Sequence, residues 1–149
     1  NVASRLATAA TFGATGVNFE PDDPLEIVQA VTQGRGADAA IEAVGSADAT
    51  RAAADLLRPG GRIAALGGHA EQHRALSPGE LYDRNLSYAA GRCPARHYMP
   101  ASLALAARKE DLIKTLISHR LPLSEGVDAY RHFAARKPGW NKVVLSPGS

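Results

Sequence analysis

The sequence predicts an α/β fold that contains part of a doubly wound, parallel sheet. Three observations predict it: helical and strand patterns alternate over residues 1–94, two of the strand patterns are apolar on both faces, and turns rich in glycine or proline separate them. Strands that are apolar on both faces belong in a sheet that helices cover on each side. Alternating helices and strands connect such strands by right-handed crossovers. With 45% hydrophobic and 21% charged residues among 149, the composition is that of an ordinary soluble domain.

The first predicted elements are a short helix, a brief strand and a second helix. Residues 4–12 place apolar side chains at helical spacing, and Ser4 is able to cap that helix. A brief strand is expected around residues 15–19. The PDDP segment interrupts the chain and begins the second helix, with Asp23 as its N-cap and Pro24 at its first position.

Three further strands complete the predicted sheet. They are expected at about residues 37–44, at residues 62–68 and at residues 86–92. The first of them is apolar on both faces except at two acidic positions, and the second is almost wholly apolar. An alanine-rich helix over residues 46–57 and a short helix over residues 77–85 alternate with these strands, which completes the α/β pattern.

The last third of the chain has three predicted elements. Residues 101–117 have a helical pattern, residues 121–137 form a separate helix, and the KVVLSP segment at 142–147 is a final strand closed by proline. Four large apolar residues of the second helix share one face and are expected to lie in the core: Leu123, Val127, Tyr130 and Phe133.

The four strands predicted before residue 95 fit strands 3 to 6 of a doubly wound sheet with the spatial order 3-2-1-4-5-6. The glycine-rich phosphate turn that follows strand 1, and the acidic ribose ligand that ends strand 2, are not in this sequence. Two absent central strands would leave a gap of roughly 15 Å, at ~4.8 Å per strand. Buried unpaired backbone groups cost about 1–3 kcal/mol each. We therefore expect either upstream sequence or a third strand that is displaced or exchanged between chains.

Charge and cysteine content limit the partners and the compartment. A net charge of +2 with mixed signs along the chain gives little support to a nucleic-acid partner or an anionic membrane. Cys93 is the only cysteine, so neither an intrachain disulfide nor a cysteine-cluster zinc site is possible. The sequence has no apolar run of about 18 residues and no secretory leader pattern. These features predict a cytoplasmic protein.

Several motifs, taken in order, carry a resemblance to a known family. They include S-R-L-A-x-A-x-x-F-G-A at 4–14, T-x-G-R-G-A-D-A-A-I-E-A-V-G at 32–45 and L-R-P-G-G-R-I-A-A-L-G at 57–67. With G-R-C-P-A-R at 91–96 and K-V-V-L-S-P at 142–147, the set resembles the C-terminal portion of zinc-type medium-chain alcohol dehydrogenases, near their formaldehyde-dehydrogenase-like branch.

The resemblance implies a division of the chain and a function. Residues 1–94 would be the later half of a dinucleotide-binding Rossmann domain, and residues 95–149 the return segment that completes the catalytic domain. The parent protein would transfer hydride between an alcohol or aldehyde and NAD or NADP, with NAD favoured. Its catalytic zinc ligands would lie in an N-terminal domain that this sequence lacks, so no catalytic or metal-binding residue carries over. This chain alone would be inactive.

The candidate cofactor-binding residues are strand-end positions and cations. Ligands of open α/β sheets bind at the carboxyl ends of the strands, where glycine lets a flat ring approach the backbone. By resemblance, residues 44–46 would flank adenine and its ribose, and the strand ends at 66–68 and 89–92 would contact nicotinamide. Arg5 would bind ribose, and Lys142 would bind pyrophosphate. The alternative for each is turn chemistry or a solvated charge. The candidates are Arg5, Val44, Gly45, Ser46, Leu66, Gly67, Gly68, Ala89, Gly91, Arg92 and Lys142.

Two other features suggest an association and exclude a site. The strand at 86–92 is an edge strand, which in the resembled family often pairs with its twin, so a homodimer or tetramer is expected. His69 and His73 are four residues apart without cysteine partners, so a metal site is not predicted there. The other histidines, at 97, 119 and 132, suggest none either, and no base adjoins Cys93 to make it a nucleophile.

Three other classes of protein also fit the sequence. A methyltransferase with a similar sheet, using S-adenosylmethionine, is suggested by GADAAIEAVG followed by LRPGG, although the chain ends without the antiparallel hairpin such enzymes add. A non-catalytic module that dimerises through residues 86–92 is a second alternative. A zinc-free quinone reductase relative is the third, and only the missing domain separates it from the leading interpretation.

Overall fold

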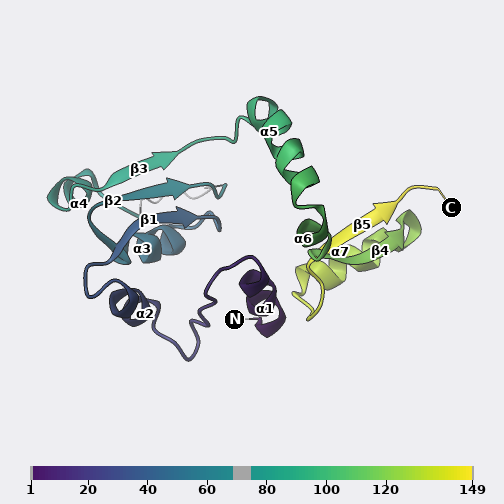
Figure 1. The fold of residues 1–149 in the computed structure, drawn as a ribbon, viewed down its shortest axis with the longest axis horizontal. Coiled ribbons are helices and arrows are strands. Elements are labelled where there is room, and N and C mark those ends of the chain that lie inside the picture. Colours follow the sequence, from purple (N-terminus) through teal and green to yellow (C-terminus); the bar gives the residue numbers. More distant parts are fainter. Residues whose placement is uncertain (1, 69–74, 149) are drawn as a thin grey trace. The chain divides into compact units, whose positions relative to one another are not determined.

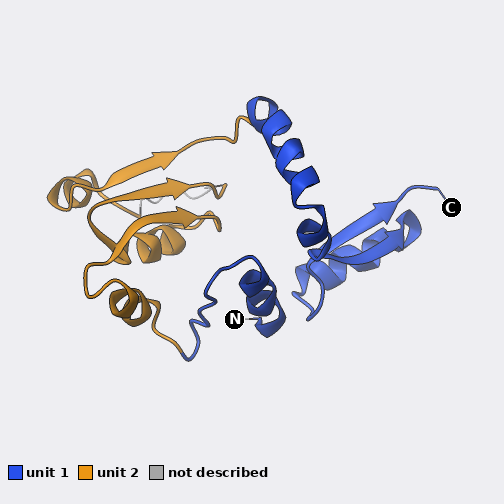
Figure 2. Cartoon of the chain, viewed as in Figure 1, with its two compact units in different colours: residues 1–21, 95–149 blue, residues 22–94 orange. Residues whose placement is uncertain are grey.

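The computed structural model describes residues 2–68 and 75–148, which form two compact units (Figure 2). One unit is Asp22–Pro94, and the other combines Asn1–Pro21 with Ala95–Ser149. Within the described ranges, every helix is too short or too polar to cross a membrane.

The unit Asp22–Pro94 is built on a parallel three-stranded sheet with the order β1-β2-β3 (Figure 1). Helices alternate with the strands along the chain, as the sequence predicts, so the predicted α/β class with parallel strands is confirmed. The elements are α2 (Pro24–Val31), β1 (Ala37–Glu42), α3 (Ala47–Asp55), β2 (Leu57–Ala65), α4 (Pro78–Asp83) and β3 (Ser87–Ala90).

Side-chain caps begin each helix of this unit. Asp23 accepts a hydrogen bond of 2.8 Å from the Leu25 N–H at the start of α2, with Pro24 at the first helical position as predicted. Ser46 caps α3 in the same way. At α4, Ser77 and Glu80 form a reciprocal capping box. These local signals explain why the helix starts were predictable from the sequence.

The core of this unit lies on one face of the sheet. Ile63, which is 1% exposed, packs with Ala54, Leu57 and Leu86. The opposite face is open, because Ile41 of β1 is 71% exposed. The sequence predicted cover on both faces, and the described residues do not provide it. The apolar pattern of β1 therefore marks a face that the described residues of this unit leave uncovered.

The unit that combines the two ends of the chain contains a second parallel sheet. β4 (Ile117–Pro122) pairs with β5 (Lys142–Ser146), and a 3₁₀ turn and α7 connect them. Gly126 and Ala129 are the buried residues of α7, and a Cβ on Gly126 would lie 3.2 Å from a methyl of Leu145. The remaining elements are α1 (Ala3–Thr11), α5 (Ala95–Arg108), α6 (Glu110–Lys114), η1 (Leu123–Glu125) and α7 (Gly126–Ala134).

Three sequence predictions about strands and caps are wrong. The chain is irregular at residues 14–18, so the strand expected around 15–19 does not form. The segment ISHRLP, whose two ends were expected to belong to two helices with residues 118–120 between them, is strand β4. Ser4 lies inside α1, where Val2 occupies the N-cap position and makes no side-chain bond. Pairing with β5 overrides the helical pattern at β4, whereas residues 14–18 have no such partner strand.

The predicted core face of the second C-terminal helix is exposed. Its four residues are between 48% and 74% exposed, so the prediction that they lie in the core is wrong for this structure. The small residues Gly126 and Ala129 lie against the sheet instead, because they allow close approach of helix and strand. The exposed residues are Leu123, Val127, Tyr130 and Phe133.

Asp38, near the start of β1, accepts hydrogen bonds from two arginines. Arg35 Nη1 lies 2.6 Å from Asp38 Oδ1, and Arg58 Nε lies 2.7 Å from the same oxygen. These hydrogen bonds hold the pKa of Asp38 well below its usual range, and the bond from Arg35 has a larger effect than the bond from Arg58. The cluster connects the turn before β1 to the beginning of β2.

The Asp38 cluster predicts a change in acid sensitivity. A carboxyl whose pKa is lowered in the folded state stabilises the fold above its unfolded pKa of about 3.9, and that contribution is lost as the pH falls through the folded value. We expect Asp38→Asn to reduce the decline of the thermal midpoint from about pH 4 to pH 2. Calorimetry across that range checks it, with Arg58→Gln expected to be intermediate. An unchanged acid slope for Asp38→Asn would contradict this role.

Candidate functional site

The carboxyl ends of the three strands meet at one edge of the first sheet (Figure 1). In register, Glu42 of β1 lies beside Ala65 of β2, and Ala65 lies beside Ala90 of β3. The segments that continue from these positions contain eight of the candidate residues, from Val44 to Arg92, and a ninth, Ala89, lies just before Ala90 in β3. The fold therefore brings together strand-end residues that are far apart in the sequence.

Glycines allow the ends of β1 and β2 to touch through their backbones. A Cβ on Gly67 would lie 2.2 Å from the backbone nitrogen of Gly45, and a Cβ on Gly45 would lie 2.9 Å from that of Gly68. Gly45 also has a φ of +90°, which residues with a side chain rarely adopt. No other residue type fits at Gly45 or Gly67 without moving backbone. The contact produces a smooth strip of main chain along the edge.

Glu42 joins the ends of β1 and β2 by hydrogen bonds, and it was not among the site residues predicted from the sequence. Its side chain is 3% exposed, and its Oε1 accepts the N–H groups of Val44 and Gly45 at 2.5 and 2.7 Å. Its carbonyl oxygen accepts the Leu66 N–H at 2.7 Å. The only sequence signal was an acidic residue in an otherwise apolar strand. The apolar side chains of Val44 and Leu66, 78% and 67% exposed, remain open to solvent beside it.

The two candidate cations, Arg5 and Lys142, lie in the other unit. Arg5 donates from Nη2 to the backbone oxygen of Trp140 at 3.3 Å, two residues before Lys142 begins β5. A cavity of about 570 Å³ adjoins Arg5, and a second of about 260 Å³ adjoins Lys142. Both cavities are bordered by Phe133 and Asn141. Arg5 and Lys142 therefore approach the same short segment of chain.

Residues 1–108 match the protein family described as zinc-binding dehydrogenase. The chain belongs to this family. Zinc-type alcohol dehydrogenase B of Aspergillus flavus is 37% identical over an alignment that covers 99% of this chain and 34% of that protein. A probable zinc-binding alcohol dehydrogenase of Mycobacterium tuberculosis is 30% identical, with coverage of 99% and 38%. The resemblance predicted from the ordered motifs is confirmed.

Solved structures of alcohol dehydrogenases have the same fold. Alcohol dehydrogenase TADH from Thermus sp. ATN1 superposes with a TM-score of 0.87 and 30% identity, over 99% of this chain and 42% of that one. An alcohol dehydrogenase from Thermotoga maritima superposes with a TM-score of 0.83 and 27% identity, over 98% of this chain and 41% of that one. The chain thus spans about two fifths of these dehydrogenases.

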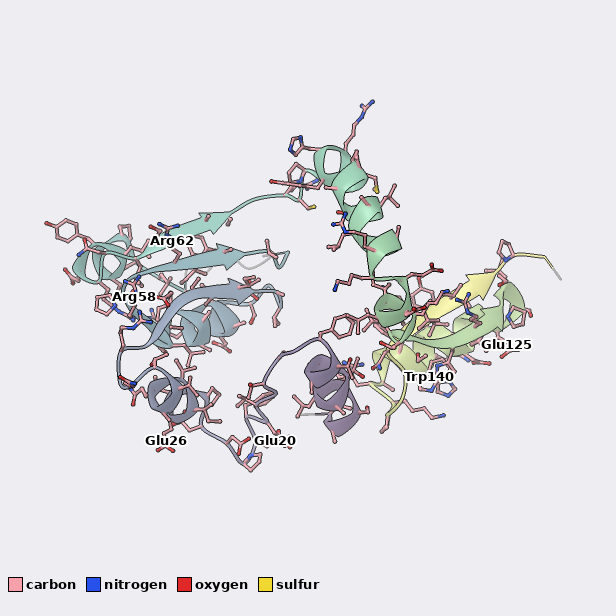
Figure 3. The ribbon with its side chains drawn as sticks, viewed as in Figure 1. Glu20, Glu26, Arg58, Arg62, Glu125 and Trp140 are labelled. Atoms are coloured by element: carbon pink, nitrogen blue, oxygen red, sulfur yellow. The ribbon has the colours of Figure 1, made fainter. Side chains whose placement is uncertain are left out.

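The zinc of this dehydrogenase family does not fit the residues described here. Within residues 2–68 and 75–148, no three side chains of His, Cys, Asp or Glu gather closely enough to hold a metal. His119 stacks on Trp140 at 3.9 Å between ring centroids, and His132 lies 4.6 Å away from that ring, so both serve an aromatic cluster (Trp140 is labelled in Figure 3). His69 and His73 lie outside the described residues, and Cys93 is an exposed free thiol.

Proposed function

We propose that this chain is the cofactor-positioning part of an oxidoreductase that transfers hydride between an alcohol or aldehyde and NAD or NADP, with NAD favoured. The observation that carries the proposal is the backbone contact of Gly45 with Gly67 and Gly68 at the carboxyl edge of a parallel sheet. Open α/β sheets bind nucleotides at that edge, and main chain free of side chains lets flat rings approach. The family's relatives are named alcohol dehydrogenases, which supports the reaction class.

Each candidate residue has a proposed part in holding the cofactor. Residues 44–46 would flank adenine and its ribose, and residues 66–68 would face nicotinamide together with Ala89, Gly91 and Arg92. Arg5 would donate to ribose hydroxyls or a phosphate, and Lys142 to the pyrophosphate. The bound nicotinamide would supply the hydride acceptor or donor. The zinc that polarises the substrate oxygen would be held by the N-terminal domain of the parent protein.

The remaining proposals concern assembly and location. β3 is an edge strand and all four of its residues are exposed, which supports pairing with a second copy in a homodimer or tetramer. The single cysteine supports a cytoplasmic location. We also propose that residues 95–149 complete a catalytic domain, with the exposed apolar face of α7 as part of that contact. The 149-residue chain alone should then be inactive.

Nucleotide titration tests the proposed function. NADH is expected to bind and to enhance its fluorescence, NADPH to bind more weakly, and S-adenosylmethionine not to bind. The parallel β4–β5 pair, in place of an antiparallel hairpin, already argues against a methyltransferase. Binding of S-adenosylmethionine without NADH would replace the proposal with that alternative. A stable dimer without affinity for any nucleotide would favour the non-catalytic pairing module.

Lys142→Ala is expected to weaken NADH binding by about tenfold, because a charge-assisted hydrogen bond contributes about 1.5–3 kcal/mol. Fluorescence titration in low salt measures the change. Lys114→Ala is the matched control, because it removes a lysine of the same unit that pairs with Glu110 and borders neither cavity. Equal affinities for NADH in the unaltered protein and Lys142→Ala would remove Lys142 from the proposed site.

A further inference from the structure

We propose that Glu42 is a positioning residue for the nucleotide, acting through the backbone turn that follows β1. The inference rests on the proposed cofactor edge. Glu42 has no contact with the cofactor in this scheme. Its carboxylate instead holds the main chain of Val44 and Gly45 in the one conformation that allows the ends of β1 and β2 to meet.

Two hydrogen bonds attach the buried Glu42 side chain to the turn after β1. One carboxylate oxygen of Glu42 accepts two successive N–H groups, and the side chain is 3% exposed. Hydrogen bonds are electrostatically stronger in the low dielectric of the protein interior than in water. The turn is therefore held from inside the sheet and not by solvent.

Glu42 also joins the ends of both strands. Its side chain holds the turn after β1, while its carbonyl oxygen accepts the N–H of Leu66 at the end of β2. Gly45 then lies against Gly67 and Gly68 with no room for a Cβ. Loss of the carboxylate would release Gly45 from this contact, and the edge would lose its shape.

The hydrogen bonds of the turn limit which part of a nucleotide it can bind. Successive backbone N–H groups in a turn form a concavity that binds anions such as phosphate. At Val44 and Gly45, the Glu42 carboxylate already occupies both groups. The turn thus offers the exposed Val44 side chain and the adjacent main chain to an uncharged part of the nucleotide. This agrees with the adenine and ribose contacts proposed above for residues 44–46, with the pyrophosphate held elsewhere.

Two substitutions of Glu42 separate positioning from general stability. Glu42→Gln keeps a carbonyl oxygen that can accept both N–H groups, whereas Glu42→Leu keeps the volume and removes the acceptor. Leu86→Ala is the control, because it weakens the core of the same unit away from the edge. The measurements are thermal midpoint, amide exchange at Val44 and Gly45, and binding of NADH by fluorescence titration.

Glu42→Leu is expected to abolish exchange protection at Val44 and Gly45, to weaken NADH and adenosine binding about tenfold, and to leave inorganic pyrophosphate competition unchanged. Glu42→Gln should stay within about threefold of the unaltered protein, and Leu86→Ala should lower only the thermal midpoint. Retained protection, or unchanged NADH affinity, in Glu42→Leu would overturn the positioning role alone. Failure of the unaltered protein to bind NADH or NADPH would overturn the proposed function, and this inference with it.

Discussion

Gly67→Ala is expected to unfold or strongly distort the carboxyl edge of the first sheet. The added Cβ would lie 2.2 Å from the nitrogen and 2.4 Å from the Cα of Gly45. Neither atom can move without shifting the main chain between β1 and α3. Overpacking of this kind costs about 1–3 kcal/mol or more, and a contact with backbone belongs at the upper end. A loss of about 3 kcal/mol would lower the thermal midpoint by roughly 6–12 °C in a domain of this size.

The functional effect of Gly67→Ala should exceed the loss of stability. At a temperature where the variant remains folded, we expect NADH binding to weaken by at least tenfold, because the strip of main chain proposed to receive the cofactor would be displaced. Gly68→Ala is the matched control for stability, since a Cβ there meets no atom within 4 Å. It should remain within about 0.5 kcal/mol of the unaltered protein. Equal stability of the two variants would show that the strand ends do not touch as described.

Ile63→Ala is expected to cost about 2–5 kcal/mol of unfolding free energy, the range for large buried aliphatic side chains replaced by alanine. Ile63 is 1% exposed and packs against Ala54, Leu57 and Leu86 in the core of the first unit. Urea unfolding should show a lower midpoint with an unchanged slope, because the surface exposed on unfolding is nearly the same. The effect is large for a single change because a domain's total stability is about 5–15 kcal/mol.

Ile41→Ala supplies the comparison for Ile63→Ala. Ile41 lies on the opposite face of the same sheet and is 71% exposed, so its truncation in the 149-residue chain should cost no more than about 0.5 kcal/mol. If a longer protein covers this face, the same substitution there should be more costly than in the isolated chain. Comparable losses for the two isoleucines in the isolated chain would mean that the sheet is covered on both faces.

The helix starts and the strand order of the first unit could be predicted from the sequence. Asp23, Ser46 and Ser77 lie within four residues of the backbone groups that they cap, so their effect is local and readable. The strands at β1 and β2 were also predicted, because apolar runs bounded by turn residues have few alternatives, although β2 begins at Leu57 and includes the RPGG segment expected to be a turn. The proposed site followed from these strands, since parallel strands end at one edge.

The mistaken predictions arise because local sequence does not show which segments come into contact. Residues 14–18 have an extended pattern and the ends of β4 have a helical one, and in both segments the absence or presence of a partner strand decides the outcome. The apolar pattern over α7 predicted the helix correctly, but it predicted the wrong face of that helix as the one that packs in the core. Periodicity shows which side chains share a face, but it does not show which face lies against the sheet.

The sequence by itself determined the α/β class, the helix caps, the family and the candidate strand ends. Each of these depends on neighbouring residues or on ordered motifs, which a linear chain displays. Only the tertiary structure decided that Gly45 lies against Gly67 and that Glu42 holds the turn between β1 and α3. Such contacts join residues by register across a sheet and by burial of a carboxyl group. Neither property exists until the strands have paired.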